Sequence, residues 1–193
     1  MFNRQRIVAV ALPALVMLTL SGCSLLSAPG PAPLTGTAAC AQGHTWTASL
    51  EDLSTQVSDS LKASGVPVSA VTTTGELTLD WNVQGHVVLK GDYVITVTAA
   101  PAADQLITLV ETHTGSATGA AYVNGEVAIP RKWDASQVQV ETTANNNGAA
   151  LDPLPFTVPN TTFDDSVGLE LTCSGSDLTT HPRGGGITQT WTR

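Results

Sequence analysis

The stretch Glu76-Leu77-Thr78-Leu79-Asp80-Trp81-Asn82-Val83 alternates polar and apolar side chains without interruption. Successive side chains of a β-strand point to opposite faces, so this period of two predicts a strand with one buried face. The Thr-rich and Lys-poor composition also favours strands over helices, because β-branched residues pack well on a pleated surface. We therefore expect a mainly β fold.

The segments that follow repeat this pattern and are separated by short turn signals. Gly91-Asp92 lies between apolar runs at 86–90 and 93–98, which predicts a hairpin. Asn124-Gly125 is the strongest hairpin signal, because both residues tolerate the positive φ of a type I′ turn. Asn145-Asn146-Asn147-Gly148 predicts a further turn. Other strands are expected at 106–112, 121–123, 126–129, 137–141, 167–173 and 187–192.

One helix is predicted before these strands, preceded by a short strand at 44–48. Ser49 and Asp52 form a capping-box pattern at its start, and Gly65 with Pro67 ends it. The apolar residues of this segment recur at spacings of three, four and four and share one helical face: Leu50, Leu53, Val57 and Leu61.

The expected strands are joined by turns and not by helices, so the sheet is predicted to be antiparallel. A wholly open sheet of about eight or nine strands is uncommon. We therefore expect a curled antiparallel sheet, in the form of a barrel, half-barrel or sandwich, with the N-terminal amphipathic helix plugging or covering one side.

The N-terminus carries a different kind of signal. Arg4 and Arg6 precede an apolar stretch, Ile7 to Leu20, that is fourteen residues long. This is shorter than the roughly 20 residues a transmembrane helix needs, and it has the length of a signal-peptide core. Leu20-Ser21-Gly22-Cys23 follows directly.

This tetrapeptide resembles the lipobox of the bacterial lipoprotein class, and all four positions match. The resemblance covers only the first 23 residues. It implies a signal peptide at 1–22, cleavage before Cys23, and acyl chains such as palmitate on that cysteine. Two or three chains suffice for stable anchoring. The alternatives are a plain secretory peptide or an uncleaved signal anchor.

The resemblance also implies an address, the extracytoplasmic face of the cell membrane. The lipid-bearing Cys23 and an uncharged Pro/Ala/Gly-rich stretch would then form a flexible linker at 23–39. A single β-rich extracytoplasmic domain is expected at 40–193. Without Arg4 and Arg6, that mature chain keeps six basic and sixteen acidic side chains, a net charge of −10. Such a surface repels nucleic acid and is not attracted to anionic lipid headgroups.

Two further cysteines, Cys40 and Cys173, remain once Cys23 is acylated. In an exported chain this pair is most simply a disulfide. Two buried free thiols or a metal site are the alternatives, and the metal site lacks the usual ligand spacings.

The sequence offers no catalytic motif. Gly115-Ser116-Ala117-Thr118-Gly119 does not place its serine as a nucleophile elbow requires. Gly184-Gly185-Gly186 after Arg183 is either an anion-binding loop or a hairpin loop between the last two strands. The histidines are scattered, and the tryptophans suit either a core or a ligand cavity: His44, His86, His113 and His181, and Trp46, Trp81, Trp133 and Trp191. We expect no catalytic residue, no metal and no cofactor, and predict that the chain is not an enzyme.

Two functions remain in competition. The first is a membrane-anchored lipoprotein that binds an apolar small molecule or a lipid in its curled sheet. The second is a structural or protein-interaction module of the envelope without a small-molecule ligand. A core packed solid with Trp and Leu, leaving no cavity of about 300 Å³ or more, would count against the first function. An exposed apolar patch larger than about 400 Å² would favour the second.

Overall fold

The computed structural model describes residues 33–159 and 167–193. The signal peptide, Cys23 and the linker up to residue 32 lie outside these residues. Within the described part of the chain, no helix is long and apolar enough to span a membrane. The described residues form two helices and ten strands: α1 (Gly36–Ala41), α2 (Leu50–Ala63), β1 (His44–Ala48), β2 (Val68–Trp81), β3 (His86–Ala102), β4 (Gln105–Asn124), β5 (Val127–Asp134), β6 (Gln139–Asn146), β7 (Ala149–Ala150), β8 (Leu169–Ser174), β9 (Asp177–Pro182) and β10 (Gln189–Thr192).

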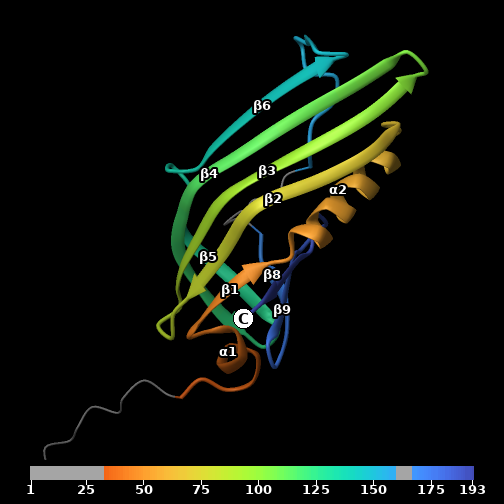
Figure 1. Cartoon of the computed structure of the whole chain (residues 1–193). Coiled ribbons are helices and arrows are strands. Elements are labelled where there is room, and N and C mark those ends of the chain that lie inside the picture. The colour runs from red at the N-terminus through yellow and green to blue at the C-terminus, as the bar shows by residue number, and fades with distance from the viewer. Residues whose placement is uncertain (1–32, 160–166) are drawn as a thin grey trace, which may run out of the picture. The chain divides into compact units, whose positions relative to one another are not determined.

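All ten strands belong to one antiparallel sheet that curls into a ring, as the turn signals predicted. The strand order is β3-β2-β1-β10-β9-β8-β5-β4-β6-β7, and an additional pairing of β3 with β4 closes the ring. The closing strand β4 is shared: its first half pairs with β6 and its second half with β5. The long strands β2, β3 and β4 therefore extend beyond the ring, where they carry β6 on one side and α2 on the other (Figure 1).

The interior of the ring is filled by tryptophan. Trp46 and Trp191 are fully buried and Trp81 is 2% exposed. The Nε1 of Trp46 donates to the Ala41 carbonyl at 2.9 Å, and the Nε1 of Trp191 donates to Thr180 Oγ1 at 3.1 Å. Three of the four tryptophans are thus core residues, because large aromatic side chains bury the most apolar area per residue.

Helix α2 forms where the apolar periodicity predicted it. Leu53, Val57 and Leu61 are buried, and Ser49 Oγ accepts from the Asp52 N–H at 3.2 Å, which is the expected N-cap. The side chain of Gln56 fixes the helix to the segment before β10. Its Nε2 donates to the Thr188 carbonyl at 2.6 Å, and its Oε1 accepts from the Thr188 N–H at 2.8 Å.

The hairpin predicted at Gly91-Asp92 is wrong. Strand β3 runs through both residues, and Gly91 pairs with Leu77 on one side and with Gly115 on the other. A glycine beside an aspartate has turn propensity, but two neighbouring strands offer it a full set of pairing partners. Tertiary pairing therefore overrides the local preference.

Two other turn predictions are confirmed. Strand β4 ends at Asn124 and β5 follows, and Asn147 and Gly148 have φ of 49° and 87° between β6 and β7. The first hairpin differs in detail, because Gly125 adopts positive φ (62°) whereas Asn124 stays in the strand. One positive φ is enough for a tight hairpin when it falls on glycine.

The predicted disulfide is confirmed, since Cys40 and Cys173 are bonded. Cys40 lies in α1, which begins at Gly36 and contacts β8. The sequence expectation assigned residues up to Ala39 to a flexible linker. In the structure the compact unit begins at Leu34 instead, because the disulfide holds this short helix against the ring.

Candidate functional site

Glycines mark the level at which the long strands leave the ring. Gly75 of β2 and Gly115 of β4 have φ of +110° and +103°, and Gly91 lies between their strands on β3. A Cβ on Gly75 would overlap the backbone of Asp92, and one on Gly115 would overlap the carbonyl oxygen of Gln137. Only glycine allows such positive φ and such close approach in a strand. Gly91 and Gly115 line a hollow on the inner face of the sheet.

That hollow is a cleft of about 270 Å³. Leu77 lines it, and the next residues on the same face of β2, Leu79 and Trp81, belong to the buried core. The cleft therefore lies at the mouth of the ring, with the tryptophan core as its floor. Its apolar walls come from β2, β3, β4, β5, β6 and the β5–β6 connection: Leu77, Leu89, Ala117, Trp133, Ala135, Val138 and Val140.

The cleft has one polar wall, formed by His113 and Tyr93. Their rings stack with centroids 4.5 Å apart and planes 8° apart. His113 is 5% exposed, and its Nε2 lies 2.7 Å from Glu111 Oε1. Thr142 Oγ1 donates to the other carboxylate oxygen of Glu111 at 3.3 Å. Because a carboxylate only accepts, Nε2 carries the hydrogen of this bond and the imidazole orientation is fixed.

Strand register explains why these groups meet. Tyr93 pairs with His113 across β3 and β4, and Glu111 pairs with Thr142 across β4 and β6. Directly paired residues of an antiparallel ladder point to the same face. Sequence reasoning did not single out Tyr93, Glu111 or Thr142, because no local pattern connects residues on different strands.

The fourth tryptophan differs from the other three. Trp133 of β5 lines the cleft and lies over Gly119, where a Cβ would come within 2.7 Å of the indole ring. Both expectations for the tryptophans are thus met within one molecule. Three of them form the core, and one forms part of a cavity wall.

The other histidines do not join this site. His44 makes an edge contact with Trp46 at 5.8 Å, and His181 Nδ1 lies 2.9 Å from Thr188 Oγ1. Within residues 33–159 and 167–193, no group of three or more His, Cys, Asp or Glu side chains is placed to hold a metal ion. The cleft therefore offers apolar surface and one oriented imidazole, an arrangement suited to holding a ligand.

The glycine run predicted as an anion-binding loop or a hairpin loop connects β9 to β10. Arg183 at its start lies 3.6 Å from Glu170, and both side chains are more than half exposed. Its charge is thus already matched by a carboxylate, and the structure favours the hairpin interpretation.

The connection beside the cleft is ordered by a carboxylate. Asp134 Oδ1 accepts from the Ser136 N–H at 2.9 Å. This hydrogen bond, together with one from the Ser136 side chain, lowers the pKa of Asp134 below its ordinary value. The ionised form thus fixes the turn that places Ala135 and Val138 in the cleft wall.

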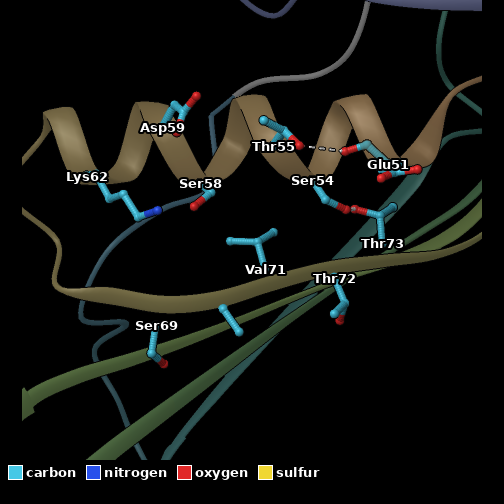
Figure 2. Close-up of a pocket in the computed structure, with 11 residues that line it drawn as sticks. Glu51, Ser54, Thr55, Ser58, Asp59, Lys62, Ser69, Val71, Thr72 and Thr73 are labelled. Atoms are coloured by element: carbon cyan, nitrogen blue, oxygen red, sulfur yellow. Dashed lines mark hydrogen bonds between the residues drawn. The ribbon is translucent and has the colours of Figure 1, made fainter.

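A second hollow of about 550 Å³ lies between α2 and β2 (Figure 2). Its helix wall is mainly hydroxyl and charged, and its strand wall consists of the consecutive residues 69–73. This polar groove differs in character from the apolar cleft. The helix residues that line it are Glu51, Ser54, Thr55, Ser58, Asp59 and Lys62.

Comparison with protein-family models finds no family that matches this chain, and comparison with curated proteins finds no similar sequence.

Proposed function

We propose that this protein is an extracytoplasmic lipoprotein that binds an apolar small molecule, or part of a lipid, in the cleft at the mouth of its ring. The observation that carries the proposal is the cleft itself, an apolar hollow with one oriented imidazole. Ligand sites are typically concave and mostly apolar, with a few fixed polar groups that orient the ligand.

The volume of the cleft limits what it can hold. About 270 Å³ is close to the lower end of the range of about 300–1,000 Å³ for ligand pockets. The ligand is therefore a small molecule, or a larger one that inserts a single ring or the end of an acyl chain. Each methylene group buried there would contribute about 0.8 kcal/mol.

The N-terminal lipobox motif supports the same proposal independently of the cleft. The lipobox resemblance implies a lipid on Cys23, and the mature net charge of −10 gives no attraction to anionic headgroups. Covalent lipid would thus be the means of attachment. An anchored domain works close to a bilayer, where apolar ligands are concentrated.

Native mass spectrometry of the full chain, purified from an exporting host, tests both parts. We expect a polypeptide that begins at Cys23 and carries acyl chains, with an additional mass that solvent extraction removes. Val140→Trp should abolish that additional mass, because this exposed wall residue would fill the cleft. Glu141→Trp, on the opposite face of β6, should retain it.

The two parts of the proposal fail separately. An intact unacylated N-terminus would overturn the anchor and leave the ligand proposal standing. Equal retention of the additional mass by both tryptophan variants would place the ligand elsewhere. A bare polypeptide from the native host would favour the envelope-interaction module.

A further inference from the structure

Strand β2 has an unpaired edge. Strand β3 pairs with it along its whole length, from Val68 to Trp81. On its other side, β1 pairs only with the last part, from Thr78 to Trp81. Among the strands that the structure describes, none pairs with this edge of β2 before Thr78.

The register identifies which backbone groups face this edge. The Trp81 carbonyl accepts from the Gly43 N–H on the β1 side, whereas the Asn82 N–H donates to the His86 carbonyl on the β3 side. Backbone groups in a strand alternate in direction, and the β2–β3 register is unbroken between Ala70 and Trp81. The N–H and C=O groups of Val71 and Thr73 therefore point away from β3, toward the open edge.

The polar groove follows this edge. Its strand wall consists of five consecutive residues, Ser69 to Thr73. A hollow on one face of a strand would be lined by every second residue, so consecutive lining means that the groove runs along the edge. Five residues of strand are about 16 Å long, the length of a short extended peptide.

Helix α2 forms the opposite wall and is fixed in place. Ser54 Oγ donates to Thr73 Oγ1 at 2.9 Å, which ties the helix to the strand at one end of the groove (Figure 2). Lys62 lies toward the other end, beyond Ser58 and Asp59. The groove is thus preformed, which lowers the entropic cost of binding.

The edge lacks the lysine, arginine and proline residues that natural proteins often use to prevent strand addition. Residues 68–76 contain no Lys, Arg or Pro, and they are rich in Val and Thr. Lysine, proline and short strand length are the usual protection of a free edge. A segment of high β-propensity without them is a template for another strand.

We propose that an extended, basic peptide segment of a partner protein binds in this groove and adds to β2 as an antiparallel or parallel strand. Backbone hydrogen bonds to Val71 and Thr73 would supply affinity, as in other cases of strand addition. Glu51 and Asp59 outnumber Lys62 in the groove, and the mature chain carries a net charge of −10. Both favour a cationic segment and disfavour a second copy of this chain.

The probe is a blocked, fluorescent heptapeptide of alternating threonine and lysine, added to the full chain in detergent micelles. The matched control is the same peptide with every internal amide N-methylated, which keeps the charges and removes the hydrogen-bond donors. We expect saturable binding of the first peptide with Kd below about 1 mM, and binding of the second that is at least tenfold weaker.

Residue-resolved hydrogen exchange distinguishes strand addition from surface attraction. The bound peptide should slow exchange at Val71 and Thr73 by at least tenfold and leave Thr72 unchanged, because that amide already faces β3. Protection of neither Val71 nor Thr73 would overturn the proposal. The proposal would also be overturned if the amides of Val71 and Thr73 became protected without peptide as the protein concentration rises. A second copy of the chain would then occupy the edge.

Paired variants on the exposed side of α2 complete the test. Ser58→Trp should fill the groove and weaken binding at least tenfold, whereas Ala63→Trp, outside the groove, should not.

The second pair of variants tests the charge of the groove. Asp59→Asn should weaken binding about two- to fivefold, the range of an exposed ion pair, and Asp52→Asn should not. Equal binding of both peptides, equal effects within either pair, or no saturable binding below about 1 mM would overturn the proposal.

Discussion

Single side chains orient the groups of the cleft. The imidazole of His113 is held on its face by Tyr93, at a centroid distance of 4.5 Å, and at its edge by Glu111, at 2.7 Å. Two independent contacts leave the ring one orientation. A ligand would therefore meet a fixed polar group in an apolar wall, the arrangement that gives orientation specificity in small sites.

The hydrogen-bonded carboxylate of Asp134 predicts how the stability of the protein depends on pH. Its hydrogen bonds from Ser136 lower the pKa in the folded state, so the folded protein binds this proton less readily than the unfolded chain. Its contribution to stability is present above the unfolded-state pKa and is lost as pH falls through the folded-state pKa.

We therefore expect the free energy of unfolding of Asp134→Asn to fall less steeply than that of the parent protein as the pH drops below about 5. Urea unfolding of both proteins at a series of pH values measures this. A carboxyl NMR titration of Asp134 should show a midpoint below the ordinary value of about 3.9. An equally steep loss of stability at acid pH in the two proteins would contradict the role of this hydrogen bond.

At the scale of elements, the close approach of the β5–β6 connection to β4 shapes the cleft. Gly115 adopts a φ of +103° and lets the β5–β6 connection pass directly against β4. That connection brings Val138 to the cleft wall. The glycine is thus a structural requirement of the candidate site, although it contributes no side chain to it.

Gly115→Ala should lower the free energy of unfolding by more than about 3 kcal/mol, because backbone overlap adds to the cost of positive φ. Gly125→Ala is the matched control, since Gly125 has a φ of +62° with nothing within 4 Å of the added Cβ. It should cost about 1–2 kcal/mol, the conformational part alone. If urea unfolding showed equal losses of unfolding free energy in the two variants, the close approach of Gly115 to Gln137 would not contribute to the cost.

At the scale of the whole domain, one covalent bond joins its beginning to its end. Cys40 and Cys173 are 133 residues apart in sequence, and they connect α1 to β8. A cross-link over so long a loop removes many conformations of the unfolded chain.

Replacing both Cys40 and Cys173 with alanine should lower the unfolding free energy by up to about 4–5 kcal/mol in the chain-entropy account. Chemical denaturation with and without reductant measures the effect. Reductant should destabilise the parent protein and leave the double variant unchanged. A reductant-sensitive double variant would mean that the stability depends on another disulfide.

Much of this fold follows from the sequence alone, because its signals are local. Alternation at 76–83, the helical spacing of Leu53, Val57 and Leu61, and the glycine after Asn124 each act within a few residues. The disulfide could also be predicted, since only two cysteines remain beside the lipobox. Gly91-Asp92 shows the limit, because the same dipeptide that favours a turn becomes mid-strand when neighbouring strands pair with it.

The cleft and the groove depend on contacts between distant segments, and only the tertiary structure decided them. Tyr93, His113 and Trp133 lie on three strands, and strand register brings them together. The open edge of β2 exists because β1 is shorter than the strand it pairs with. Local periodicity determines which face of a strand is buried. Pairing between distant strands determines what that face meets, and the sequence carries no short-range signal for that pairing.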